Sequence, residues 1–177
     1  MRNFRRVIVL MIFFFLVFPH NIFVQGQDKI ESVDWEKLAD FFIEITGWDK
    51  KGDASGSDMS MGMETVGRAL QEYSSGKRSL SIHIIDTAKS LMVLPGIKIV
   101  MKNNMKTSQE YVETITINGF PAVKTYNYSR KKAGLIVLIL DRFVIQMDGD
   151  EFEEKQVSEL EDAAKKQDLE GIAKLGK

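Results

Sequence analysis

The chain contains no cysteine and only two histidines among its 177 residues. The absence of cysteine excludes disulfides, thiolate nucleophiles and cysteine zinc sites. Lys and Arg number 24 against 25 Asp and Glu, a net charge of -1, whereas a nucleic-acid-binding domain usually carries a clear basic excess. Phosphate-loop, dinucleotide, GxSxG and HExxH motifs are also missing. We therefore expect no nucleic-acid partner and no cofactor, and no enzyme class is indicated.

The first 26 residues differ from the rest of the chain. They hold three arginines and no acid, followed by the unbroken apolar run VIVLMIFFFLVF at residues 7–18. Val24 and Gly26 then stand at the positions where a signal peptidase accepts small residues. The apolar run is shorter than the roughly 20 residues that span a bilayer. The pattern predicts a secretory signal peptide cleaved after Gly26, and the alternative is an uncleaved anchor.

Residues 27–177 are expected to form a single domain. They carry 21 basic and 25 acidic side chains, a net charge of 21 - 25 = -4. A chain of this size buries enough surface to fold without disulfides, and an exported protein without cysteine is typical of the bacterial envelope. We predict a periplasmic or secreted protein that meets the membrane only through the signal segment before cleavage.

Charge alternates in blocks along this domain. Residues 27–97 have a net charge of -4, residues 98–142 of +5, and residues 148–177 of -5. Such blocks usually form solvated faces. The functional interpretation is a basic middle face for an anionic partner such as lipid headgroups or cell-wall polymer.

The N-terminal half shows a mixture of patterns. Apolar residues from Trp35 to Ile45 recur at helical spacing, with Ser32 as a possible cap and Gly47 at the end. Residues 49–62 are rich in Gly, Ser and Asp and predict a loop. The acids of that loop do not have calcium-loop spacing, so we predict no metal site there.

Two further elements follow in this half. Residues 63–74 and 79–87 predict a β-hairpin joined by turn residues at 75–78. Residues 95–105 predict a helix with Pro95 in its first turn and an apolar stripe of Ile97, Val100, Met101 and Met105.

The C-terminal half predicts an antiparallel meander. Strands are expected at 110–117, 120–129, 135–140 and 143–148, with a tight turn at Asn118-Gly119. The segment 135–140 is apolar on both faces, which is typical of a covered central strand. Helices are expected over 151–166 and after Asp168, which can cap the last one.

These elements predict an α+β fold with the order α-β-β-α-β-β-β-β-α. An antiparallel sheet of about six strands, with helices packed on one face, satisfies the apolar patterns. The features that suggest a relative are Gly47-Trp48, the segment from Arg68 to Tyr73, Asn118-Gly119 and Asp141-Arg142-Phe143. With these the chain resembles small exported bacterial proteins of uncharacterised families and is loosely similar to the PsbP/Mog1-type fold. The resemblance implies a binding or accessory role and transfers no catalytic residue.

Aromatic and basic side chains provide the main candidate site. Tyr126, Tyr128 and Lys124 alternate along one strand and so share a face. Together with Arg142 they are the predicted contacts for an envelope protein, a lipid or a cell-wall polymer. Ordinary cross-strand packing accounts for the same residues without any function.

Two other functions stay open. An apolar-ligand carrier would need a large dry pocket lined by Met101, Met105 and Phe42. A small hydrolase would need His83, the sole histidine after residue 26, beside a carboxylate and a hydroxyl such as Ser81. Neighbouring same-face residues on a strand stand about 6.6–7 Å apart, which is too far for a direct Ser81–His83 hydrogen bond. We therefore predict no catalytic, cofactor-binding or metal-binding residues, and the leading hypothesis is a non-enzymatic binding or accessory domain.

Overall fold

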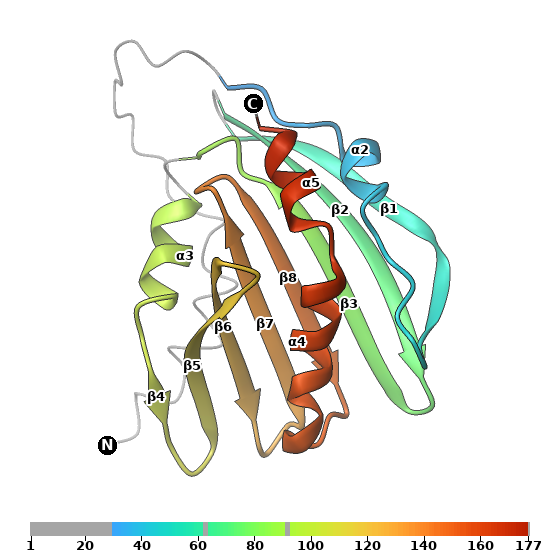
Figure 1. The fold of residues 1–177 in the computed structure, drawn as a ribbon, viewed down its shortest axis with the longest axis vertical. Coiled ribbons are helices and arrows are strands. Elements are labelled where there is room, and N and C mark those ends of the chain that lie inside the picture. Colours follow the sequence, from blue (N-terminus) through green and yellow to red (C-terminus); the bar gives the residue numbers. More distant parts are fainter. Residues whose placement is uncertain (1–29, 62–63, 91–92, 177) are drawn as a thin grey trace.

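The computed structural model describes residues 30–61, 64–90 and 93–176. Within these residues, eight strands form one antiparallel sheet in the order β1-β2-β3-β8-β7-β6-β5-β4 (Figure 1). Strand accounts for 47% of the structure and helix for 22%. The expected α+β class with about six strands and helices packed on one face is therefore wrong. The sheet is larger, and its helices are few and short.

The strands follow one another mostly as hairpins. Their bounds are β1 Asp49–Met61, β2 Glu64–Ser75, β3 Arg78–Asp86, β4 Met105–Lys106, β5 Glu110–Ile117, β6 Phe120–Asn127, β7 Lys132–Ile139 and β8 Phe143–Asp150. Among the described strands, a single pairing joins strands that are not consecutive in sequence: β3 lies beside β8, with His83 opposite Gln146. This pairing joins an N-terminal three-stranded unit to the C-terminal meander.

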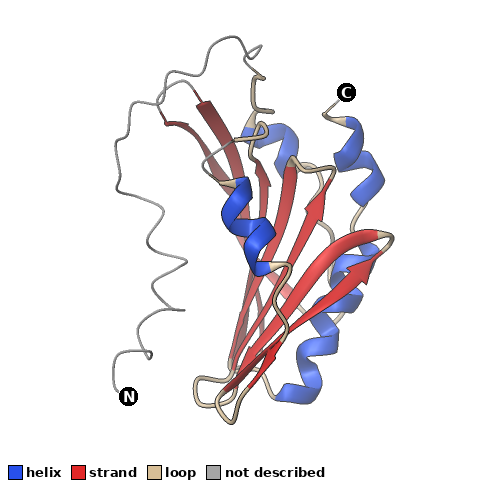
Figure 2. Cartoon of the chain, turned by 90° about the vertical axis from the view of Figure 1, so that its left-hand side faces the viewer, coloured by secondary structure: helices blue, strands red, loops and turns tan. Residues whose placement is uncertain are grey.

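Short helices lie on both sides of this sheet. They are α2 Trp35–Ala39, α3 Leu94–Val100, the 3-10 turn η3 Glu154–Gln156, α4 Val157–Lys166 and α5 Leu169–Lys174. The side view in Figure 2 shows α3 on one side of the strands and the C-terminal helices on the other. The main apolar core lies between the sheet and α2, α4 and α5, and a smaller one lies under α3.

The C-terminal half confirms the meander and its helices. Asn118 and Gly119 both have positive φ, 48° and 86°, as a tight two-residue turn requires. Strand β7 lies between β6 and β8 and contributes to both cores, which explains its continuous apolar sequence. The Asp168 side chain accepts a hydrogen bond from the Gly171 N–H and so caps α5, as predicted.

The predicted helix beginning at Ser32 is mostly absent. Helix α2 covers only Trp35–Ala39, with Asp34 at its N-cap. The chain beyond it is irregular, and the Tyr73 hydroxyl donates a hydrogen bond to the Ile43 carbonyl at 2.9 Å. The side chains of Phe41, Phe42 and Ile45 still pack on the main core. Apolar spacing thus identified the buried residues correctly, but packing against the sheet overrode the helical conformation.

The predicted loop at 49–62 is instead strand β1 over its described part. It pairs with β2 along almost its whole length and is broken by a register shift between Lys51 and Ser55. Gly56 lies under the ring of Trp35, where a Cβ would overlap the indole. The strand is exposed at the sheet edge, so charged and small residues replace the usual apolar alternation. The bulge and the charges also protect this edge from pairing with another chain.

Replacing Gly56 with Val is expected to lower the free energy of unfolding by about 1–3 kcal/mol, the usual cost of overpacking. The added methyl groups would push the Trp35 ring away from its seat on β1. Urea denaturation measures the change. The matched control is Ser57→Val, at the next exposed position of the strand, which we expect to be neutral because β-branched residues suit strands. Equal stability of the two variants would contradict this account of α2 docking.

Helix α3 is shorter than predicted and covers the second face of the sheet. It ends at Val100 with Met101 as its C-cap, and Met105 belongs to strand β4. Ile97, Val100 and Met101 do pack together, against Val123 and Leu138. The helices therefore do not all share one face.

The charge blocks of the sequence pair largely with one another. Lys124, Lys131 and Lys132 of the basic block form ion pairs with Glu161, Glu153 and Asp150 of the acidic C-terminal block. This intramolecular pairing neutralises much of the basic excess. The expected signal segment, residues 1–26, lies outside the described residues. Within those that are described, no helix is long and apolar enough to cross a membrane.

Candidate functional site

Three of the four predicted contact residues lie together, on the face that carries the main core. Tyr126 is only 4% exposed, and its hydroxyl donates a hydrogen bond to the Phe152 carbonyl at 2.9 Å. The Tyr128 hydroxyl donates to the Glu154 carboxylate, also at 2.9 Å. Tyr126 is therefore a packing residue, while Tyr128 lies at the border between the core and solvent.

Lys124 is held between two acids. Its Nζ lies 3.0 Å from Glu161 of α4 and 3.2 Å from Glu113 of β5. Burial alone would lower the pKa of Lys124, but hydrogen bonds to Glu161 and Glu113 outweigh it and raise the pKa. Lys124 thus ties helix α4 to the sheet, and its charge is already compensated within the molecule.

Arg142 lies at the opposite end of the sheet from this group. Its guanidinium binds the carboxylate of Asp86 in a bidentate ion pair, with N–O distances of 2.9 and 2.8 Å. It also donates to the carbonyls of Glu31 and Gly176. We call this Asp86–Arg142 pair the clasp, because it joins β3, β8 and both ends of the described chain. The four predicted contacts therefore do not form one surface.

A third tyrosine, which sequence reasoning missed, completes an aromatic cluster. Tyr111 lies opposite Tyr126 in the β5–β6 register. The ring centroid of Tyr111 lies 6.1 Å from that of Tyr126 and 6.3 Å from that of Tyr128. The two-residue turn at Asn118-Gly119 fixes this register. Counting residues away from Asn118-Gly119 along both strands places Tyr111 opposite Tyr126. This count is the sequence signal that predicts the tyrosine pair.

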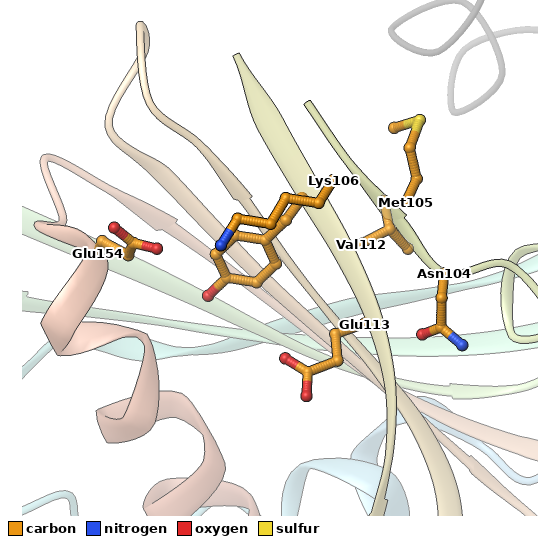
Figure 3. Close-up of a pocket in the computed structure, with 7 residues that line it drawn as sticks. Asn104, Met105, Lys106, Val112, Glu113 and Glu154 are labelled. Atoms are coloured by element: carbon orange, nitrogen blue, oxygen red, sulfur yellow. The ribbon is translucent and has the colours of Figure 1, made fainter. Parts of the chain in front are cut away.

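A groove with a volume of about 550 Å³ opens beside this cluster. Figure 3 shows it between the β4–β5 edge of the sheet and the beginning of η3. Its lining combines an aromatic ring, apolar side chains and charges of both signs, from Asn104, Met105, Lys106, Tyr111, Val112, Glu113 and Glu154. We call it the Tyr111 groove.

Local structure explains how the groove forms. Strand β4 pairs with β5 at only two positions, Met105 with Val112 and Lys106 with Tyr111. Because directly opposed residues share a face, Lys106 stands beside the half-buried ring of Tyr111. Glu154 enters from η3, whose start is fixed by a capping box between Glu153 and Gln156. Burial chiefly raises the pKa of Tyr111, so its hydroxyl stays a neutral hydrogen-bonding group near pH 7.

The surroundings of His83 do not make it a general base. The imidazole is 7% exposed, and the Arg68 guanidinium contacts its Nδ1 at 3.0 and 3.2 Å. Burial and then the Arg68 charge lower the pKa of His83 to about 4, so it is a weak proton acceptor at neutral pH. Asp148 lies 3.9 Å from Nε2, and no hydrogen bond joins Ser81 to His83 in the described part of the chain.

The residues of the carrier hypothesis are separated. Met101 packs in the core under α3, whereas Phe42 packs on the other face and Met105 lines the Tyr111 groove. No described pocket contains all three. In the residues the structure describes, no group of three acids or histidines is placed to hold a metal ion.

Comparisons of the chain with family models, curated proteins and solved structures found no match. The similarity to the PsbP/Mog1-type fold therefore stays a prediction.

Proposed function

We propose that this chain is an exported, non-enzymatic binding or accessory domain of the bacterial cell envelope, acting by surface recognition. The Tyr111 groove is its contact site. The observation that carries the proposal is a half-buried tyrosine ring beside Lys106, Glu113 and Glu154 in an open groove. Aromatic groups flanked by a few polar groups are the usual composition of binding sites.

The chemistry of the groove supports binding rather than catalysis. Glu113 and Glu154 already interact with Lys124 and Tyr128. Lys106 and Asn104 add a cation and an amide. Lys106, Glu113 and Glu154 can orient a polar ligand over the ring of Tyr111. Met105 and Val112 face the other side of the β4–β5 edge and extend the groove around it (Figure 3). An envelope protein, a lipid headgroup or a cell-wall polymer offers such mixed chemistry.

Replacing Tyr111 with Ala is expected to weaken binding by about 30-fold, because a central aromatic contact is typically worth 2 kcal/mol or more. The chain is immobilised and exposed separately to solubilised envelope proteins, lipid vesicles and cell-wall fragments. Since Tyr111 is half-buried, Lys106→Ala is tested beside it. Lys106 is exposed, and this variant should weaken binding without altering the melting temperature.

The matched control is Thr116→Ala, an exposed change on the same strand outside the groove. It is expected to bind like the wild type. Equal retention by the wild type, Tyr111→Ala and Lys106→Ala would place the contact elsewhere. Failure of the wild type to retain any of the three fractions would contradict the binding role itself.

A further inference from the structure

The end of the sheet that carries the clasp combines three unusual features. The first is backbone strain. Of seven non-glycine residues with positive φ in the described chain, four lie in two loops here: Ala88 and Lys89 after β3, and Leu140 and Asp141 between β7 and β8. Bulky residues seldom adopt this conformation. Strained positions of this kind tend to cluster where a protein makes functional contacts.

The second feature is the residue type at the start of the β7–β8 loop, Leu140. Leu140 and Asp141, in the three-residue loop 140–142, have φ values of 50° and 53°, in the left-handed region. The β5–β6 bend at the same end of the sheet has Asn118-Gly119 at its positive-φ positions, and these residue types adopt that conformation readily. Leu140 is instead 57% exposed. The turn therefore keeps a large apolar side chain in solvent, where neither packing nor turn geometry favours it.

The third feature is where the chain enters the domain. Arg142 donates a hydrogen bond to the Glu31 carbonyl, and Asp86 accepts one from the Val33 N–H. Glu31 is thus fixed at the clasp end, next to Ile30, which is itself 37% exposed. Residues 19–30 are the whole connection from the apolar run at 7–18. Fully extended, such a connection of 12 residues reaches about 40 Å.

From these features we infer that the clasp end rests on a lipid bilayer surface, with Leu140 and Ile30 as its apolar contacts. This goes beyond the proposed function and involves different residues. The occupant is a bilayer because, in the chain that keeps residues 1–26 as an uncleaved anchor, only residues 19–30 separate this end from the apolar run at 7–18. The neighbouring charges largely cancel, since Lys98 pairs with Asp141 and Lys37 with Asp34. The contact is therefore mainly apolar and depends little on salt.

The arrangement also orients the Tyr111 groove. Tyr111 lies at the start of β5, in the same transverse row as Gly149 near the end of β8. The clasp lies at the other end of β8, next to Phe143. In Figure 1 the β7–β8 turn and α5 lie at the upper end of the sheet and β4 at the lower end. A domain resting on the bilayer through Leu140 presents its groove on the side away from the membrane.

Single-cysteine reporters test this inference, because the full chain has no cysteine of its own. Full-length Leu140→Cys and Lys77→Cys are each labelled with bimane in vesicles of phosphatidylethanolamine and phosphatidylglycerol (7:3) that contain spin-labelled lipid. Lys77 lies in the β2–β3 turn, at the far end of β3 from the clasp. Lipid quenching at position 140 is expected to be at least three times that at position 77. Equal quenching would overturn the inference.

A second variant separates the apolar contact of Leu140 from attachment through the apolar run at residues 7–18. Asn tolerates positive φ, so Leu140→Asn keeps the turn and removes the apolar group. In a Lys98→Cys reporter chain, we expect this change to halve quenching at position 98 while the melting temperature stays equal or rises. Unchanged quenching would overturn the role of Leu140. Either result leaves the binding test at Tyr111 unaffected.

Discussion

Replacing Arg142 with Met is expected to lower the free energy of unfolding by about 3–5 kcal/mol, the usual effect of removing one partner of a buried ion pair. The side chain of Asp86 is fully buried, so its carboxylate would lose its only counter-charge in the described chain. Two backbone N–H groups, of Val33 and Ala88, would still bind it. We therefore expect the lower part of that range. Urea denaturation followed by circular dichroism measures the loss.

Two control variants distinguish the stability lost by breaking the clasp from the stability lost by removing any charged side chain. Lys98→Met breaks the exposed Lys98–Asp141 pair and is expected to cost less than about 1 kcal/mol. The double variant Asp86→Asn with Arg142→Met should recover part of the stability, because no unpaired charge then remains buried. If Arg142→Met cost no more than Lys98→Met, the clasp would not be a main source of stability.

Lowering the pH from 7 to 4 is expected to destabilise the fold through His83. Burial, followed by the nearby Arg68 charge, lowers the pKa of His83 from 6.5 in the unfolded chain to about 4 in the folded one. Between these values the unfolded chain binds a proton that the folded chain does not. Stability is thus complete above pH 6.5 and declines as the pH falls towards 4, by up to about 3 kcal/mol.

The measurement is urea denaturation at pH 7.5, 5.5 and 4.5, with His83→Gln as the comparison. That variant cannot titrate at this position, so its stability should fall less over the same range. Asp148 opposes the effect, because burial raises its pKa and the folded state then binds a proton more readily on acidification. Parallel pH profiles for the wild type and His83→Gln would show that His83 does not control acid stability.

The part of the fold that the sequence predicted correctly is the part whose signals are local. The meander from β5 to β8 depends on alternating apolar residues and on a two-residue turn, and both act within a few residues. Strand β1 was missed because its stability comes from pairing with β2 and from Trp35 seated on Gly56. A strand of Gly, Ser and Asp has no strand signal until its partners are known.

The candidate site likewise has some features that local sequence patterns predict and others that depend on contacts between distant residues. Alternation placed Lys124, Tyr126 and Tyr128 on one face correctly, but it did not reveal that the main core occupies that face. Glu154 reaches the groove from a turn 26 residues beyond its partner Tyr128. Asp86 and Arg142 are separated by 56 residues and meet only because β3 pairs with β8. Contacts at such separations follow from strand order, which periodicity does not determine.

The clasp also changes how the two ends of the described domain behave. One guanidinium holds the carbonyls of Glu31 and Gly176, so it closes almost the entire domain into a non-covalent ring. Secreted proteins commonly achieve such closure with a disulfide, which restricts the unfolded chain. Here the closure exists only in the folded state and disappears on unfolding. A short linker could therefore join the two ends, and a circular permutant could open at the β2–β3 turn without moving any strand.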